Sequence, residues 1–517
     1  MKIVDESRLQ GILRRLIAVV FILGALVSIW FFLTNLNSVE PTKAAVLLVF
    51  GCGVVLLMAI LAPTHTRRIK ALAVRMARWR YSVPLVVLLT MALGLAIRWY
   101  CFVRFSYDTS LDADPDAIYL AAQAIACGTG ISGDVRTASC AYLASYMNLL
   151  SFFIGAIKDS WLAIIVLNTL FDFCGAILAM LLVRKMTAPG SRVSVLVFAL
   201  WFLSPFNLIF SLISLPISAV NTCIVAVVFV CLLFTEQLLK KRTAKALLLA
   251  LITGMVMGIA NCFRPIFPVA IIAFVIFMIF VVIRSGQAKK LVPVALAAVV
   301  IILVPFNLLQ LAQTRLVTAQ TGIEVPSNPG AFSFYVGANR ESNGRFNSED
   351  WRYRQEVINS SPSLDAAYDR LQEEALDRYG SYGALETLDL FANKLYEFSN
   401  RQDDMYNANA TLIGYKGSRT AQAFTLYLQV FCAILYIASA LMMLRCAKRM
   451  AINSGGAKRN DQIVLFLTIL LLGFFLSHAF VEAAHRYAQI MYPLFMVLSV
   501  CLLDSFSTKA KPSQKSS

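Results

Sequence analysis

Uninterrupted apolar runs of about twenty residues recur along this chain of 517 residues, and they constrain its fold more than any other feature. A helix needs about twenty apolar residues to cross roughly 30 Å of hydrocarbon. The runs are continuous rather than alternating, which favours helices over a β-barrel. Charged residues make up only 15% of the chain, against about 25% in soluble domains. The sequence therefore predicts an all-α polytopic membrane protein.

The net charge of +17 is distributed unevenly. Acidic residues gather in 105–160 and 310–420, which hold 6 and 15 of the 29 Asp and Glu. Basic residues gather elsewhere, because 28 of the 46 Lys and Arg lie in seven short loops or tails: 1–15, 63–82, 184–192, 235–246, 284–290, 445–460 and 505–517. Basic loops of membrane proteins stay on the cytoplasmic side. The excess of basic residues therefore indicates which loops face the cytoplasm, and no nucleic-acid partner is expected.

Placing every basic loop in the cytoplasm gives about twelve transmembrane helices with both termini inside. The predicted spans are 16–34, 44–62, 83–104, 161–183, 193–210, 216–234, 246–262, 265–283, 291–309, 421–444, 462–480 and 487–504. Residues 141–158 are apolar enough for a further span, but counting them would put Arg184 and Lys185 outside. They are predicted to form a helix lying on the outer surface, in contact with membrane lipid. The first run lacks a small-residue cleavage site and is interpreted as a retained signal-anchor.

These spans divide the chain into four regions. Residues 1–82 hold two helices and a basic loop, and 83–309 form a transmembrane core with an acidic first outer loop at 105–160. Residues 310–420 are predicted to form a mixed, mainly helical domain outside the cytoplasm. Residues 421–517 supply three more helices and a tail.

The domain predicted at 310–420 contains one clear helix signal. Ser363 is a candidate N-cap, and Gly380 is a candidate stop. Between them lies an apolar stripe at helical spacing, formed by Tyr368, Leu371, Ala375 and Leu376.

Three carboxylates, Asp112, Asp114 and Asp116, crowd into five residues of the first outer loop. One interpretation is structural: Asp114 caps a helix, Pro115 opens it and Gly128 ends it. The other is chemical, since carboxylates at a membrane surface can serve as a general base or bind a divalent cation such as Mg or Mn. A single cap does not account for three acids, and both interpretations remain open.

Segments spread over residues 83–504 resemble, in order, the C-type membrane glycosyltransferases, in particular the protein O-mannosyltransferase and aminoarabinose transferase branch. The first is the loop signature Asp114-Pro115, Tyr119, Ala122 and Gly128. The later segments are SPFNLIFSLISLP (204–216), GMVMGIANCFRP (254–265), YVGANRESNGRFNSEDW (335–351) and EAAHRYAQIMYP (482–493). The segment at 335–351 is similar to one found in Gram-positive members.

The resemblance implies transfer of a sugar from a polyprenyl phosphate to a hydroxyl of a glycan, lipid or protein, with inversion, outside a bacterial plasma membrane. It implies that Asp114 or Asp116 is the base. Asp114 is the favoured one, with Asp116 and Asp112 expected to assist it or to bind metal, and Asp114 and Asp116 are the candidate metal ligands. The remaining expected site residues are Arg264, Arg486 and Arg340 for the donor phosphate, and Tyr119, Asn339 and Tyr487 for positioning the acceptor. One departure stands out, because LISLPISAVN (212–221) lacks the second acid that several relatives carry there.

Three other functions compete with this interpretation. A polysaccharide polymerase or ligase also has about twelve spans and one large late outer loop, but it depends on loop arginines rather than on an early acidic loop. A transporter places polar groups and broken helices near mid-membrane, often within repeats. Here charge inside the spans is nearly limited to Arg98 and Asp172, which are expected to pair. A non-catalytic scaffold is the fourth possibility.

Two smaller clusters have alternative interpretations. Cys127 and Cys140 lie thirteen residues apart in the outer loop and could form a disulfide or remain free thiols. His478, Glu482 and His485 are spaced to share a face, as a metal site or as a hydrogen-bonded cluster.

Overall fold

Long helices dominate the computed structural model, which describes residues 6–37, 82–108, 114–187, 193–399, 406–452 and 459–507. Ten stretches of these residues are helical, long and apolar enough to cross a membrane. The bundle helices are α1 (Glu6–Asn37), α4 (Ser82–Arg104), α8 (Ser160–Met186), α9 (Val193–Phe202), α10 (Pro205–Phe210), α11 (Ile217–Leu239), α12 (Thr243–Phe263), α13 (Phe267–Arg284), α14 (Ala288–Thr321), α20 (Arg419–Ile452), α21 (Arg459–Ser477) and α22 (Tyr492–Ser507). The all-α polytopic class is confirmed. The predicted span 44–62 lies outside the described residues, so a total of twelve stays a prediction.

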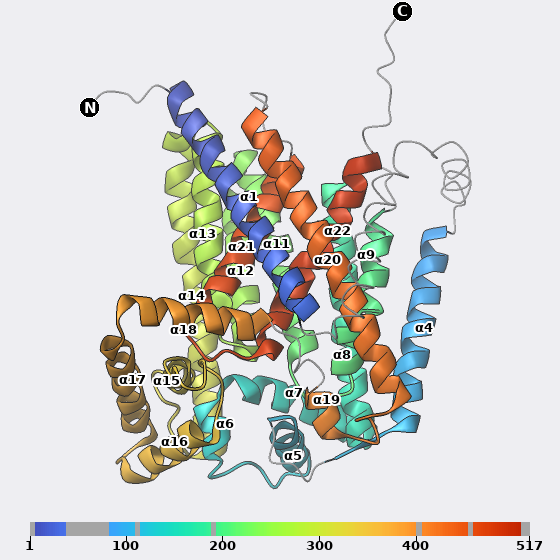
Figure 1. Ribbon diagram of the computed structural model, residues 1–517, viewed down its shortest axis with the longest axis vertical. Coiled ribbons are helices and arrows are strands. Elements are labelled where there is room, and N and C mark those ends of the chain that lie inside the picture. Colours follow the sequence, from blue (N-terminus) through green and yellow to red (C-terminus); the bar gives the residue numbers. More distant parts are fainter. Residues whose placement is uncertain are drawn as a thin grey trace, which may run out of the picture.

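Shorter elements gather at one end of the bundle, the lower end in Figure 1, which we call the loop end. They are α5 (Asp114–Ala126), α6 (Val135–Ser139), α7 (Tyr142–Ile157), α15 (Ala331–Gly337), α16 (Ser348–Ser360), α17 (Leu364–Ser381), α18 (Ala384–Ser399), α19 (Tyr406–Thr411) and the 3-10 helix η2 (His485–Met491). A two-residue strand, β1 (Ser106–Tyr107), pairs antiparallel with β2 (Leu412–Ile413). Helices α1 and α4 begin, and α22 ends, at the opposite end.

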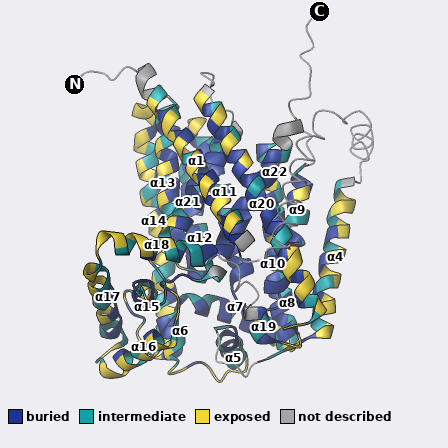
Figure 2. Ribbon diagram, in the orientation of Figure 1, coloured by how far each residue is buried: buried dark blue, intermediate teal, exposed yellow. Residues whose placement is uncertain are grey.

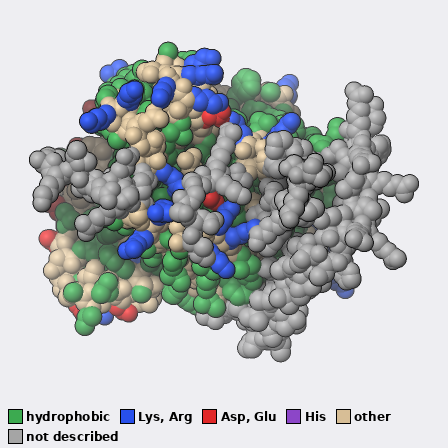
Figure 3. Space-filling model, turned by 90° about the horizontal axis from the view of Figure 1, so that it is seen from above, with side chains coloured by type: hydrophobic (Ala, Val, Ile, Leu, Met, Phe, Trp, Pro, Cys, Tyr) green, Lys and Arg blue, Asp and Glu red, His purple; other side chains and the backbone are tan. Residues whose placement is uncertain are grey.

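The opposite end is basic. Seen from above in Figure 3, Lys and Arg side chains are spread over it and few acidic ones are visible. Arg184 and Lys185 end α8 there, and Glu236 pairs with Lys185 and Lys240. The two ends of the bundle therefore differ in charge, as the sequence predicts, and we call this one the basic end.

Burial separates the inner helices from the lipid-facing ones (Figure 2). The apolar stretch of α22 is 83% buried, whereas that of α4 is 22% buried. Leucines such as Leu88, 62% exposed, cover the outer face of α4. An apolar surface of this kind on a long helix is what a hydrocarbon solvent requires.

Some boundaries differ from those expected. Helix α14 continues to Thr321, about 18 Å beyond the predicted span end at 309 at 1.5 Å per residue. The helix therefore continues past the boundary predicted at 310, because helical structure persists after the apolar run stops. The predicted span 193–210 breaks between α9 and α10, where Pro205 disfavours a helical conformation for the preceding residue.

Helix α7 was predicted at 141–158 as a surface helix. At 16 residues it is shorter than the helices that qualify as candidate spans, and in Figure 1 it runs across the bundle rather than along it. Its buried face includes Tyr146, Met147 and Leu150, whereas Phe152 is 71% exposed. It packs against α5, α8 and α12, and so forms a platform at the loop end.

Helices α15–α18 form a small helical domain (residues 331–399) with an apolar core of its own. That core contains Tyr335 and Val357 together with Tyr368, Leu371 and Ala375 of the predicted stripe. Ser363 caps α17 as predicted, since its side chain accepts a hydrogen bond from the Ala366 N–H at 3.1 Å. Leu376 was wrongly placed in the stripe and is 53% exposed.

Two glycines let α12 and α14 approach closely. A Cβ at Gly254 would lie 2.3 Å from the Ile302 carbonyl oxygen, and one at Gly258 would lie 2.7 Å from a Leu309 methyl. In lipid, such small residues permit the backbone contact that holds helices together. The glycine-rich segment 254–265 therefore sets the position of the helix that ends at Arg264.

We expect Gly254→Ala to destabilise the protein. The added methyl meets backbone that cannot move aside, and overpacking of this kind costs about 1–3 kcal/mol. A lower midpoint of thermal unfolding in detergent would show this effect. The control is Gly155→Ala in α7, where a Cβ meets nothing within 4 Å. Equal midpoints for the two variants would contradict the packing role.

Arg98 and Asp172 form the expected ion pair inside the bundle. An Arg98 guanidinium nitrogen lies 2.7 Å from an Asp172 carboxylate oxygen, and both side chains are at most 2% exposed. Arg98 also donates to the Ser211 hydroxyl at 3.0 Å. The pair joins α4 to α8 and to the chain after α10. This buried pair therefore ties three parts of the bundle together.

Candidate active site

Asp114, the first residue of α5, lies between two arginines from different parts of the chain. Arg136 of α6 donates to its Oδ1 at 2.7 Å, and a nitrogen of Arg486 in η2 lies 3.6 Å from its Oδ2. Asp134 caps α6 by accepting hydrogen bonds from the N–H groups of Arg136 and Thr137. This cap fixes the backbone from which the Arg136 side chain reaches Asp114.

Arg264 and Glu482 complete this group. Arg264 follows the last residue of α12, and its guanidinium carbon lies 4.4 Å from the centre of the Tyr487 ring, a cation–π contact. The Tyr487 hydroxyl donates to Glu482 Oε2 at 3.3 Å, and Arg486 lies 3.9 Å from Glu482 Oε1. We call these six residues the arginine–carboxylate cluster: Asp114, Arg136, Arg264, Glu482, Arg486 and Tyr487.

The two carboxylates of the cluster have different electrostatic surroundings. Burial raises the pKa of Asp114, but Arg486, Arg136 and Arg264 outweigh it, so this pKa lies below its usual range. Burial raises the pKa of Glu482, and Asp114 raises it further, against the opposing effect of Arg486. Asp114 is therefore ionised at neutral pH, and Glu482 holds its proton more strongly. With three arginines around one firmly ionised acid, the cluster carries net positive charge.

The small helical domain holds the segment that leads into Arg486. Two backbone hydrogen bonds, each 2.8 Å long, run from Glu482 N–H to the Ser333 carbonyl and from Ala483 N–H to the Gly344 carbonyl. The Tyr379 hydroxyl donates to the Phe480 carbonyl at 3.1 Å. We call residues 480–483 the clamped segment, because the domain fixes their backbone.

Gly337 and Lys394 make close contact with this segment. A Cβ at Gly337 would lie 2.6 Å from the Val481 carbonyl carbon and 2.9 Å from the Phe480 oxygen. Lys394 Nζ donates to the Gly337 carbonyl at 2.8 Å and to the Tyr379 hydroxyl at 3.1 Å. Burial lowers the pKa of Lys394 to about 7. The amine therefore acts as a buried hydrogen-bond donor at the joint between the domain and the clamped segment.

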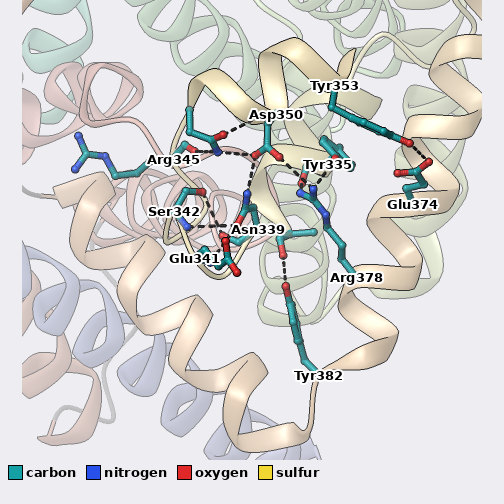
Figure 4. Close-up of polar contacts among 12 residues, drawn as sticks. Tyr335, Asn339, Glu341, Ser342, Arg345, Asp350, Tyr353, Glu374, Arg378 and Tyr382 are labelled. Carbon is teal, nitrogen blue, oxygen red and sulfur yellow. Dashed lines mark hydrogen bonds and ion pairs between the residues drawn. The ribbon is translucent and has the colours of Figure 1, made fainter. Parts of the chain in front are cut away.

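The segment 335–351 forms a turn that side-chain hydrogen bonds hold in place, as Figure 4 shows. Asn339 Oδ1 accepts hydrogen bonds from the backbone N–H groups of Glu341 and Ser342, and Asn339 Nδ2 donates to Asp350 at 2.9 Å. Asp350 also pairs with Arg378 at 3.1 Å. Asn339 was expected to position the acceptor, but its polar atoms are engaged in holding the turn.

Arg340, expected at the donor phosphate, lies elsewhere. Its side chain is 41% exposed, and its guanidinium pairs with Glu386 and Asp389 of α18. A side chain neutralised by two acids on its own domain is not placed to attract a phosphate. We therefore leave Arg340 out of the site.

Asp116 and Tyr119 do not join Asp114. Side chains two residues apart on a helix point to opposite faces, so Asp116 turns inward, is 1% exposed and lies near Tyr107. The Tyr119 ring stacks on Tyr107 at 4.9 Å. Asp112 lies outside the described residues. The expectation that Asp116 assists Asp114 directly therefore conflicts with the helix geometry.

The described residues do not fit the divalent cation considered for Asp114 and Asp116. Both Asp114 oxygens face arginines, and Asp116 points away from them. Within the described ranges, no group of three or more His, Cys, Asp and Glu is placed to hold a metal ion. His478 of the other candidate metal set instead hydrogen-bonds through Nδ1 to the Phe474 carbonyl at 2.7 Å.

Sequence reasoning missed Arg136, and it considered Glu482 only as part of a metal site or of a hydrogen-bonded cluster. Arg136 had a signal, because it is one of two basic residues in the acidic loop 105–160, the other being Lys158. A lone arginine among acids often marks an ion pair. Cys127 and Cys140, considered as a disulfide, are both free thiols here.

Comparisons with protein-family models, with curated proteins and with solved structures find no match to this chain. Functional inference therefore rests on the arginine–carboxylate cluster and on its place at the loop end of the bundle.

Proposed function

We propose that the protein is a membrane glycosyltransferase that moves a sugar from a polyprenyl-phosphate donor to an acceptor hydroxyl. One observation carries the proposal: α5, α6, α12 and η2 bring an ionised carboxylate and three arginines together at one end of a membrane bundle. Glycosyl transfer from a lipid phosphate needs these two kinds of group, a base for the acceptor and cations for the phosphate.

Asp114 is the proposed base. Its lowered pKa keeps it ionised at neutral pH, which is the form that accepts a proton from the acceptor hydroxyl. Arg264 and Arg486 face the phosphate that departs when the sugar leaves. Charge-assisted hydrogen bonds to phosphate are strong in a partly dry site, and they stabilise the charge that develops there.

The location follows from the charge of the two ends. Lys and Arg gather at the basic end, where cytoplasmic loops are expected. The loop end, with the cluster and the small helical domain, then lies outside a bacterial plasma membrane, and both termini lie in the cytoplasm. A lipid-linked donor would reach the cluster from the surrounding bilayer, and the acceptor is a glycan, a lipid or a protein at that surface.

Donor chemistry tests the proposal. Membranes containing the wild-type chain are expected to transfer labelled sugar from polyprenyl-monophosphate sugars. Membranes without the chain are the control. A polymerase or ligase would instead use oligosaccharides on polyprenyl diphosphate, and a scaffold would use neither donor. Transfer only from the diphosphate, or no transfer at all, would refute the proposed function.

A further inference from the structure

We propose that Glu482 is the second acid of this site and that its Oε1 delivers a proton to the donor phosphate as the sugar leaves. The inference rests on the proposed function and assigns it a second reacting side chain. The sequence lacks an acid in 212–221, where a second one was expected, and Glu482 reaches the cluster from the other end of the chain.

The geometry of Glu482 indicates a group that awaits a ligand. Its side chain is 7% exposed, and among the described residues its Oε1 has no hydrogen-bond partner. Buried polar atoms in folded proteins are nearly always hydrogen-bonded, because leaving one unpaired is costly. The other oxygen, Oε2, accepts from Tyr487 at 3.3 Å, which orients the carboxyl group.

One arginine nitrogen connects the two acids. The same Arg486 nitrogen lies 3.9 Å from Glu482 Oε1 and 3.6 Å from Asp114 Oδ2. A phosphate oxygen bound to Arg486 would therefore lie close to both Glu482 and Asp114. This arrangement allows one acid to serve the leaving group while the other serves the acceptor.

The expected protonation states agree with these two roles, a protonated Glu482 for the leaving phosphate and an ionised Asp114 for the acceptor. The charged and titratable groups that face Glu482 are Arg486 and Tyr487 of η2, Asp114 of α5 and Arg264 at the end of α12. Burial and Asp114 raise its pKa more than the arginines lower it. Enzymes that use two carboxylates commonly separate their pKa values in this way. The second pKa of a phosphate monoester is about 6, so a carboxyl group with a raised pKa is a suitable donor.

The step balances as follows. The acceptor O–H bond breaks, its proton goes to Asp114, and the acceptor oxygen bonds to the anomeric carbon. The bond from that carbon to the phosphate oxygen breaks, and its electron pair stays on the phosphate. Glu482 gives this phosphate its proton, which leaves a singly charged polyprenyl phosphate. A proton passing from Asp114 to Glu482 through water restores both acids.

The test compares the pH dependence of kcat in wild type and Glu482→Gln, with a polyprenyl-monophosphate sugar as donor. Glutamine keeps the size and a hydrogen-bond donor but cannot give a proton. We expect kcat to fall about tenfold, less than the usual 10²–10⁴ for a general acid, because phosphate leaves readily as an anion. KM should change little. Wild type is expected to lose kcat at alkaline pH as Glu482 ionises, and this decline should be absent from the variant. Glu341→Gln, an exposed change in the small helical domain, is the matched control.

The outcomes separate the two proposals. If Glu482→Gln retains wild-type kcat and its alkaline decline, the acid role is wrong and the proposed function stands. If KM rises while kcat and the pH profile are kept, Glu482 only holds the donor, and the acid role is again wrong. If wild type transfers no sugar from any polyprenyl monophosphate, the function itself fails, and this inference with it.

A binding measurement on wild type gives a second test that needs no variant. Polyprenyl phosphate alone should bind less tightly as pH rises past the pKa of Glu482, because an ionised glutamate would then face the phosphate. Ionisation of the phosphate itself works in the opposite direction, since a dianion pairs better with Arg264 and Arg486. Affinity that stays level or rises with pH would overturn the proposal.

Discussion

Replacing Asp114 with asparagine is expected to lower sugar transfer by about 10²–10⁴-fold, the usual contribution of a general base. The amide oxygen can still accept from Arg136, so the helix start and its ion-pair partner keep their positions. The loss should therefore appear in kcat, with normal amounts of protein in the membrane. Transfer from labelled polyprenyl-phosphate sugar measures it directly.

Asp159→Asn is the matched control for this substitution. Asp159 is an exposed carboxylate that caps α8 by accepting from the Leu162 N–H at 2.9 Å. Asparagine caps helices about as well as aspartate, so this variant should transfer sugar at the wild-type rate. If Asp114→Asn also keeps the wild-type rate, Asp114 serves structure alone, and the base must be sought elsewhere.

Replacing Gly337 with alanine should reduce transfer by about 10²-fold, although this residue does not touch the proposed substrate. The new Cβ would meet the backbone of Val481 at 2.6 Å, so the clamped segment must shift. Arg486 and Tyr487 follow directly, and a displacement of about 1 Å in a reacting group can cost that factor. A lower kcat with membrane insertion unchanged is the expected pattern.

Gly380→Ala tests whether any glycine change in the small helical domain has this effect. A Cβ at Gly380 meets nothing within 4 Å, and alanine favours a helix there by about 0.5–1 kcal/mol. This variant should be fully active. Full activity in Gly337→Ala as well would show that the clamped segment does not position the arginines.

Local patterns in the sequence predict the membrane part well. Apolar runs locate the helices, because hydrocarbon demands continuous apolar surface wherever lipid is in contact. The apolar runs did not predict the end of α14, because polar residues interrupt the apolar pattern over 310–321 while the helix continues to Thr321. The pairing of Arg98 with Asp172 could be expected because lone charges inside a bundle need partners.

The site was only partly predictable. Asp114, Arg264, Arg486 and Tyr487 were expected from the resemblance to the C-type glycosyltransferases, and the structure brings these four together. Asp116 was misjudged because its direction depends on the helix that begins at Asp114. The environment of Glu482 depends on docking against Ser333, about 150 residues earlier in the chain, and no local pattern encodes that contact.

The clamped segment also has a consequence for biogenesis. A ribosome makes Ser333, Gly344 and Lys394 well before residues 480–487, and domains tend to fold in the order of their synthesis. The small helical domain would thus fold before the segment that docks on it exists. Docking of that segment, through Glu482 and Ala483, completes the cluster as a final step. A chain released before residue 480 would contain most of its helices but would lack the Glu482, Arg486 and Tyr487 that complete the cluster.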